Sequence, residues 1–203
     1  TWTAITRSVT YALGGGTGTV PTQAPVAEGS SFVVASSSGI TRAGFTFNNW
    51  SDGTSGYAPG STYTVGASNV TLTATWTAVT RSVTYALGGG TGTVPTQGPV
   101  AEGSSFIVAS SSGITRTGYT FNNWSDGTAG YAPGSSYTVG ASNVTLTASW
   151  TATTRSVTYA LGGGTGTVPT QSAVAEGSTF TVGSSSTITR SGYSFNNWSD
   201  GST

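Results

Sequence analysis

The chain lacks four side chains on which much protein chemistry depends: its 203 residues include no Cys, Met, His or Lys. Without His and Cys, the usual nucleophile–base pairs and transition-metal sites cannot be assembled. Without Cys, no disulfide stabilises the fold. The sequence therefore predicts a protein that is not an enzyme and that uses no metal or cofactor.

Charge is also scarce. Charged residues make up 6% of the chain and the formal net charge is zero, whereas about 25% of an ordinary soluble protein is charged. A chain with no Lys and no excess of positive charge lacks the footprint that binds phosphate backbones or anionic lipids. No apolar run approaches the roughly 18 residues of a membrane-spanning helix. We therefore expect no nucleic-acid partner and no membrane insertion.

The absent residues also bear on the compartment. Cys and Met are the side chains most readily oxidised, and neither occurs here. Such a composition suits a protein that stays outside a cell for a long time. At the same time aromatic residues reach 11%, which is more than disordered segments usually carry. We expect a folded extracellular protein.

What is present is a long internal repeat. Residues 7–80 align without gaps on residues 81–154, with 66 of 74 positions identical. Residues 155–203 align on the first 49 of these positions with 38 identities. Self-similarity at a fixed period indicates tandem domains. We predict the tail of a preceding repeat at 1–6, repeat 1 at 7–80, repeat 2 at 81–154 and an incomplete repeat 3 at 155–203, as in a window from a longer array.

Within repeat 1, alternation of apolar and polar residues predicts five short strands. They are expected at residues 8–13, around Phe32 and Val34, at 45–50, around Tyr63 and Val65, and at 69–78. The apolar phase shifts between Phe47 and Trp50, which predicts a β-bulge near Asn48 and Asn49.

The segments between these strands are rich in glycine, proline and serine. Gly14 to Gly18 is expected to be too permissive for regular structure. Asp52-Gly53 and Pro59-Gly60 are expected turns. Ser36 to Gly39 is expected to form a short helix or an irregular crossover, because Ser is a poor helix-interior residue. Little helix is expected anywhere.

The junction between repeats carries no breaker residue. From Asn69 to Leu87 there is neither Gly nor Pro, so the last strand of one repeat should pass directly into the first strand of the next. Apolar residues occupy even positions up to Ala78 and odd positions from Val83, so the core-facing side should change there. Such a connection fixes spacing better than a flexible linker. The predicted fold class is mostly β: a tandem array of small modules joined by continuous extended strands.

A string of short motifs recurs in the same order in each repeat. In repeat 1 they are Val9-Thr10-Tyr11, Gly15 to Pro21, Glu28-Gly29-Ser30, Thr41 to Trp50, Asp52-Gly53-Thr54, Tyr57 to Ser61 and Asn69 to Trp76. Together they resemble the Listeria-Bacteroides repeat, the family that includes the B repeat of internalin B, and the resemblance covers the whole chain. It implies a β-grasp-like module, arrayed on bacterial surface or secreted proteins, with structural or adhesive roles and no enzymatic activity. The family usually carries more charge.

Two features invite a chemical interpretation. The glycine run Gly14 to Gly18 lacks the Lys of a phosphate-binding loop. Glu28 and Asp52 could be imagined as paired carboxylates, but both precede Gly in turn contexts. Turn residues, or surface ion pairs with Arg7 and Arg42, are the simpler interpretation.

Aromatic residues beside the Asp52-Gly53 turn could stack on sugars. The candidate glycan contacts are Trp50, Tyr57, Trp124, Tyr131 and Trp198. Burial of the tryptophans is favoured, because each aromatic side chain buries some 150–250 Å² and a module of this size needs that area. A Thr-to-Gln ester through Gln23 and glycosylation at the sequons starting at Asn49 and Asn69 are left open.

The function predicted is a structural module, acting as a rigid stalk, spacer or filament segment whose partners are the neighbouring repeats. One alternative is an adhesin or glycan-binding repeat that uses avidity on a host or cell-surface glycan. Another is a strand-exchanging fibre subunit that pairs with other copies, because repeat 3 lacks the counterparts of the strands from Tyr57 to Trp76 and should have unpaired edges.

Overall fold

The structure is a computed structural model that describes residues 1–201. All its regular elements are β-strands, and no helix occurs in this range. The predicted mostly-β class and tandem organisation are therefore confirmed. Ser36 to Gly39 forms the irregular crossover rather than the short helix. The prediction for repeat 3 extends to residue 203, and residues 202–203 lie outside the described part.

The chain divides into two compact units. The first comprises residues 1–84, 97–107 and 136–144, and the second comprises residues 85–96, 108–135 and 145–203. Repeat 1 lies wholly in the first unit, and the described residues of repeat 3 lie wholly in the second. Repeat 1 is the module described most fully below.

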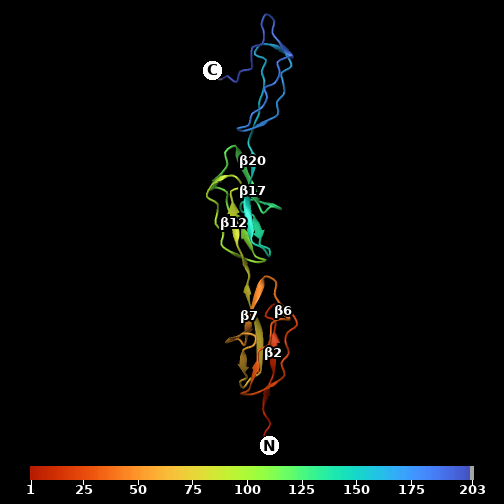
Figure 1. Cartoon of the computed structure of the whole chain (residues 1–203), viewed down its shortest axis with the longest axis vertical. Helices are drawn as coiled ribbons and strands as arrows, with labels where there is room; N and C mark the ends of the chain where they lie inside the picture. Colours follow the sequence, from red (N-terminus) through yellow and green to blue (C-terminus); the bar gives the residue numbers. More distant parts are fainter. Residues whose placement is uncertain (202–203) are drawn as a thin grey trace. The chain divides into compact units, whose positions relative to one another are not determined.

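Short strands follow one another through each repeat (Figure 1). The first set is β1 (Thr6–Arg7), β2 (Val9–Ala12), β3 (Thr17–Gly18), β4 (Val26–Ala27), β5 (Ser31–Val33), β6 (Ile40–Thr41), β7 (Phe45–Ser51), β8 (Gly56–Tyr57), β9 (Thr62–Thr64) and β10 (Val70–Ala78). The second set is β11 (Thr80–Arg81), β12 (Val83–Ala86), β13 (Thr91–Gly92), β14 (Val100–Ala101), β15 (Ser105–Ile107), β16 (Ile114–Thr115), β17 (Tyr119–Ser125), β18 (Gly130–Tyr131), β19 (Ser136–Thr138) and β20 (Val144–Ala152). The last set is β21 (Thr154–Arg155), β22 (Thr165–Gly166), β23 (Val174–Ala175) and β24 (Ile188–Thr189).

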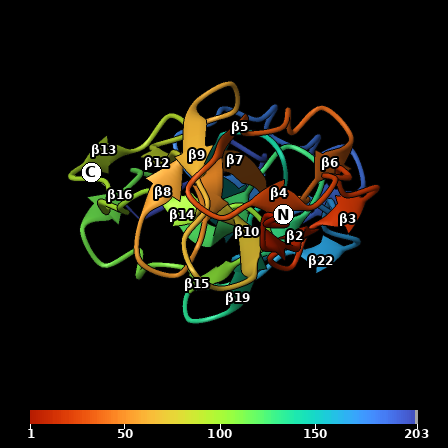
Figure 2. The same cartoon turned by 90° about the horizontal axis from the view of Figure 1, so that it is seen from below.

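The main sheet of repeat 1 has the strand order β2-β10-β7-β8 (Figure 2). Strand β10 lies parallel to β2 and antiparallel to β7, so the last strand of the repeat sits inside the sheet. Three further antiparallel pairs, β1–β4, β3–β6 and β5–β9, surround it. The five predicted strands therefore exist, and short two-residue pairings join them.

The predicted bulge is confirmed in β7. Thr75 pairs with Asn49 and Trp76 pairs with Phe47, so Asn48 has no opposite residue on β10. The Thr75 hydroxyl donates a hydrogen bond to Asn49 Oδ1 at 2.7 Å. The same hydroxyl accepts a hydrogen bond from the Asn49 backbone N–H at 3.3 Å. The bulge moves Trp50 into the core phase, because an extra residue flips the side-chain alternation.

The core of repeat 1 is one apolar cluster. Its buried members are Tyr11, Val34, Ile40, Trp50, Leu72 and Ala74. The rings of Tyr11 and Trp50 meet edge to face with centroids 4.7 Å apart. Trp50 Nε1 donates to the Ala35 carbonyl and the Ala35 N–H donates to the Tyr11 hydroxyl, both at 3.0 Å. Two core aromatics thus satisfy both backbone groups of Ala35, and the crossover needs no helix there.

The predicted change of the core-facing side at the junction is also found. Leu72 and Ala74 are buried on β10, at even positions, whereas Val83 and Tyr85 are buried on β12, at odd positions. Strand β10 ends at Ala78, and β11 lies between it and β12, with only Val79 and Ser82 outside the three strands. One expectation was wrong. The stretch from Gly14 to Gly18 contains β3, because Thr17 and Gly18 pair with Thr41 and Ile40.

Leu72→Ala should destabilise repeat 1 by about 2–5 kcal/mol, because Leu72 is fully buried in the cluster and its truncation leaves a cavity. Val33→Ala in the same repeat should change stability by less than about 0.5 kcal/mol, because Val33 is 66% exposed. Urea unfolding followed by tryptophan fluorescence measures both. Equal effects of the two substitutions would contradict this assignment of the core.

Candidate functional site

The described residues hold no obvious reaction centre. Within residues 1–201 there is no group of three or more His, Cys, Asp or Glu side chains that could hold a metal ion. The features that stand out are instead the junction where one repeat meets the next and the acidic turn at Asp52.

At the first junction a single residue is bound to both repeats through its backbone. The Val79 N–H donates to the Gly44 carbonyl of repeat 1 at 2.8 Å. The Val79 carbonyl accepts the Glu102 N–H of repeat 2 at 2.9 Å. Strand β11 then pairs with β14, with Thr80 opposite Ala101. The backbone between the repeats is therefore held on both sides.

The second junction repeats this arrangement. The Thr153 N–H donates to the Gly118 carbonyl, and the Thr153 carbonyl accepts the Glu176 N–H, both at 2.8 Å. At the start of the chain, the Ile5 carbonyl accepts the Glu28 N–H at 2.9 Å. Valine, threonine and isoleucine all serve at this position, because only main-chain atoms are needed.

A glycine makes the junction close-packed. Gly44 has φ +75°, a left-handed conformation that favours glycine. A Cβ on Gly44 would lie 3.3 Å from the Glu102 carbonyl oxygen, and one on Gly118 would lie 3.5 Å from the Glu176 carbonyl oxygen. Gly192, the counterpart in repeat 3, has nothing within 4 Å of that point. The backbones of neighbouring repeats thus approach each other where this glycine stands.

An Arg–Glu ion pair borders each junction. Arg81 Nη2 lies 2.6 Å from Glu102 Oε2, and Arg7 Nη2 lies 2.7 Å from Glu28 Oε2. The third pair, Arg155 with Glu176, is longer at 3.2 Å and more exposed. The predicted surface pairing of Glu28 with Arg7 is therefore confirmed. Partly exposed pairs of this kind contribute roughly 0–1 kcal/mol each, so the backbone bonds matter more.

Arg42 does not act as a counter-ion for either carboxylate. Its guanidinium lies over the ring of Phe45, 3.9 Å from the centroid, and its Nη1 donates to the Gly14 carbonyl at 3.3 Å. A cation over an aromatic face is attracted by the ring quadrupole. Arg42 thus ties the glycine turn after β2 to the start of β7.

Asp52 is the centre of a tight turn. Its Oδ1 accepts the N–H groups of Thr54 and Ser55, at 2.9 and 2.8 Å, and the Thr54 hydroxyl at 2.7 Å. Its Oδ2 accepts the hydroxyls of Tyr57 at 3.1 Å and Tyr63 at 3.4 Å. Asp52 and Glu28 therefore serve separate local roles and do not form a carboxylate pair.

These hydrogen bonds shift the pKa values of the ionisable side chains in the turn. Hydrogen bonds hold the pKa of Asp52 well below its ordinary value of 3.8. The Ser55 N–H makes the largest contribution, and the hydroxyl and N–H of Thr54 make smaller ones. Burial, together with the hydrogen bond to Asp52, raises the pKa of Tyr57. Burial also raises the pKa of Tyr63, with a smaller contribution from the charge of Asp52. The carboxylate is stabilised in its charged form, which is the reverse of what a general acid requires.

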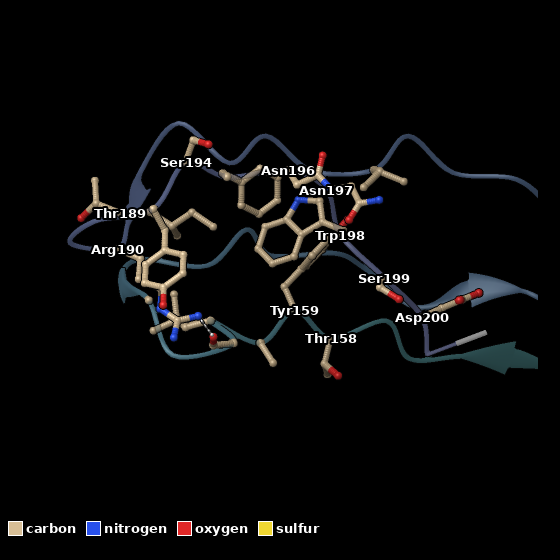
Figure 3. A pocket seen from close by; sticks show the side chains of 18 of the residues that line it. Thr158, Tyr159, Thr189, Arg190, Ser194, Asn196, Asn197, Trp198, Ser199 and Asp200 are labelled. Atoms are coloured by element: carbon tan, nitrogen blue, oxygen red, sulfur yellow. Dashed lines mark hydrogen bonds between the residues drawn. The ribbon is translucent and has the colours of Figure 1, made fainter. Parts of the chain in front are cut away.

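The candidate glycan contacts are not gathered on one open surface. Trp50 and Trp124 are fully buried, so their indole faces are not available to stack on a sugar. Tyr57 and Tyr131 are half-buried, and each donates its hydroxyl to the neighbouring aspartate. Trp198 is half-buried and lines a pocket within repeat 3 (Figure 3). The favoured burial of Trp50 and Trp124 is thus found.

The side chains considered for modification take part in local hydrogen bonds. Gln23 Nε2 donates to the Ala24 carbonyl at 3.3 Å. Asn49 Oδ1 accepts the Thr75 hydroxyl, and Asn69 Oδ1 accepts the Ser8 N–H at 3.0 Å. An ester through Gln23 and sugars on the two asparagines stay predictions.

The junction bridge had no side-chain signature in the sequence. The residue at positions 5, 79 and 153 differs each time, because its contribution is made by the backbone. A glycine recurs at 44, 118 and 192, every 74 residues. That recurrence was an available signal, but most other residues of the near-identical repeats recur at the same spacing and so hide it.

Comparison with known proteins gives one family. The model of the Listeria-Bacteroides repeat domain matches residues 8–75, 82–149 and 156–203, one match in each predicted repeat. Neither the curated proteins nor the solved structures include a match. Within residues 1–201, no helix is long and apolar enough to span a membrane.

Asp52→Asn should lower the stability of repeat 1 at neutral pH and should have a diminishing effect as the pH falls. Because the folded-state pKa lies below the ordinary 3.8, the contribution of Asp52 is complete above that value and is lost as the pH falls below it. Urea unfolding between pH 7 and pH 2 measures this. Thr54→Ala, which removes one donor and keeps the carboxylate, should have a smaller effect at pH 7. A variant difference that grows with acidity would contradict the assignment.

Proposed function

Because the chain belongs to the Listeria-Bacteroides repeat family, we propose that it is a structural segment of a bacterial extracellular or cell-surface protein. Its role is that of a rigid stalk, spacer or filament segment, built from repeats whose main partners are the neighbouring repeats. The observation that carries the proposal is the backbone bridge at the junction.

The bridge supports a fixed connection for a physical reason. A flexible linker leaves its N–H and C=O groups to water, whereas Val79 has both groups bonded, one to each neighbouring repeat. Rotating one repeat against the other would break these bonds and the adjoining β11–β14 pairing. Gly44 adds a close contact with Glu102 at the same point. A module of 74 residues measures roughly 30 Å across, so each added copy would extend the array by about that distance.

We infer that the array has no enzymatic activity. The chain has no His, Cys or Lys, and the two carboxylates whose pKa is lowered, Asp52 and Asp126, are held in their charged form by turns. The extracellular location is part of the same proposal, and it rests on the absence of Cys and Met and on the family.

A β-grasp-like architecture is likewise proposed. The mixed main sheet, in which the first long strand, β2, lies parallel to the last strand, β10, supports it. The short helix considered for Ser36 to Gly39 does not form, and an irregular crossover stands in its place. The Trp50 and Tyr11 hydrogen bonds to Ala35 supply the order that such a helix would provide.

No contact among the described residues favours glycan binding over the structural role. A repeated sugar site would need the same exposed aromatics in every copy, and two of the candidate contacts, Trp50 and Trp124, are fully buried. A glycan-binding array would therefore need other residues to contact the sugar.

Inserting Gly-Ser-Gly-Ser after Val79 should uncouple repeats 1 and 2, because the insertion separates the bridge from β11. The same insertion after Gly66, which is exposed and where a Cβ would meet nothing within 4 Å, should leave the coupling unchanged. Small-angle scattering, with NMR relaxation to compare the tumbling of the repeats, measures the result. If the natural chain already behaves as freely jointed beads, or if the two insertions have the same effect, the proposal fails.

A further inference from the structure

In repeat 1 the strands at which the chain enters and leaves the main sheet lie side by side. Strand β2 pairs with β10 in parallel register, from Val9 opposite Val70 to Ala12 opposite Thr73 (Figure 2). The chain enters the sheet at the start of β2 and leaves it at the end of β10. Because the two strands run in the same direction, entry and exit lie at opposite ends of the pair. A pull on the two ends of the repeat therefore acts along the strands.

This geometry decides how the hydrogen bonds of the pair respond to a pull. The hydrogen bonds between parallel strands are evenly spaced along the strands. When one strand is pulled past the other, all of these bonds are strained together. When both strands are pulled apart from the same end, the bonds open one after another. A pull along the strands therefore meets the combined resistance of the pair.

Further hydrogen bonds cross the pair at its first residues. The Val70 N–H donates to the Ser8 carbonyl, and the Ser8 N–H donates to Asn69 Oδ1, both at 3.0 Å. The hydroxyls of Thr10 and Thr71 form a hydrogen bond of 2.9 Å. The two strands are thus bonded through side chains as well as through the backbone.

Another hydrogen bond closes the far end of the pair, and the core covers its inner face. The Trp76 indole N–H donates to the Leu13 carbonyl at 2.9 Å. Tyr11 of β2 is 7% exposed, and Leu72, which lies opposite it on β10, is fully buried. Hydrogen bonds are stronger where water is excluded, so burial of this face adds to the resistance of the pair.

The rest of the repeat lies outside the path of such a pull. Among the described strands of the main sheet, β2 has β10 as its only neighbour, whereas β10 is held by both β2 and β7. Within the sheet, tension therefore passes from β2 directly to β10. Residues 14–69, which include the glycine-rich turn and the irregular crossover, carry no load as long as this pair holds.

Repeat 2 has the same hydrogen bonds at corresponding positions, 74 residues later. The Val144 N–H donates to the Ser82 carbonyl at 3.0 Å. The Trp150 indole N–H donates to the Leu87 carbonyl at 2.9 Å. The bonds that close the two ends of the strand pair in repeat 1 are therefore present in both complete repeats.

We propose that each complete repeat is a mechanical clamp, in which the parallel pair formed by β2 and β10, or by their counterparts, sets the force at which the repeat unfolds. The added function is resistance to tension along the chain. It rests on the proposed structural role only for the source of that tension, because the resistance belongs to a single repeat.

The chain has no Cys, so introduced Cys pairs define where a force is applied in the 203-residue chain. Ser8→Cys with Ala78→Cys pulls β2 and β10 along their length, whereas Ser8→Cys with Ser68→Cys pulls them apart from one end. All three side chains are exposed. The rupture force in optical tweezers should be at least about twofold higher for the first pair, because evenly spaced bonds share its load. A force that is equal or lower for the first pair would overturn the proposal.

The length of chain released identifies the event. The Cys positions stand 60 and 70 residues apart, so unfolding of repeat 1 should release roughly 20 nm in either geometry. Under the pull along the strands, this release should occur in one step. A shorter release at lower force would show that another contact gives way first, and would contradict the proposal.

A matched pair of substitutions, each added to Ser8→Cys with Ala78→Cys, tests the assignment to β2 and β10. Thr71→Ala removes the hydroxyl bond to Thr10, and Thr64→Ala removes the 2.8 Å hydroxyl bond to Ser31 between β9 and β5. Both threonines are exposed strand residues, so urea unfolding should show similar losses of stability. Forced unfolding depends on the unfolding barrier, so only Thr71→Ala should lower the rupture force. An equal loss of force in Thr64→Ala would overturn the assignment.

These measurements separate the clamp from the fixed junction. Val79 follows the last attachment point, Ala78, so the junction between repeats 1 and 2 lies outside the loaded segment. A low rupture force in the along-strand pull, together with coupled repeats in scattering, would overturn the clamp alone. A high rupture force together with independently tumbling repeats would overturn the stalk role alone and would support the clamp.

Discussion

Strand β10 is the element on which the rest of each repeat depends. It is bonded to β2 on one side and to β7 on the other, and it carries Leu72 and Ala74 into the core. The residue that follows it, Val79, supplies the bridge to the next repeat. Folding of the module and connection of the modules are therefore consequences of one extended segment.

The glycine-rich turn after β2 leaves the space that β10 needs in order to pack. Gly14 and Gly16 leave space for the Ala74 carbonyl and the Trp76 indole, and the indole N–H closes on the Leu13 carbonyl. Glycine is required there because the backbones approach closely, and not because the loop must flex. The same reasoning applies to Gly44, where the neighbouring backbone belongs to the next repeat.

The longer strands could be predicted because each has a burial period of two, and the bulge because its apolar phase breaks between Phe47 and Trp50. Pairs such as β3–β6 could not, because two residues have no period. The change of the core-facing side between Ala78 and Val83 could be predicted, because the apolar residues move from even to odd positions. The backbone hydrogen bonds of Val79 could not be predicted, because a backbone bond leaves no side-chain pattern. Burial of Trp50 followed from the needs of a small core.

Hydrogen exchange at the junction tests the central claim most directly. If β10 and its continuation hold both the module and the junction, the Val79 amide should exchange slowly, within the range of amides in the centre of β10 such as Leu72. The exposed turn at residues 66–68 supplies the fast reference. A Val79 amide that exchanges as rapidly as that turn would show that the bridge is open in solution, and the account of a fixed connection would be wrong.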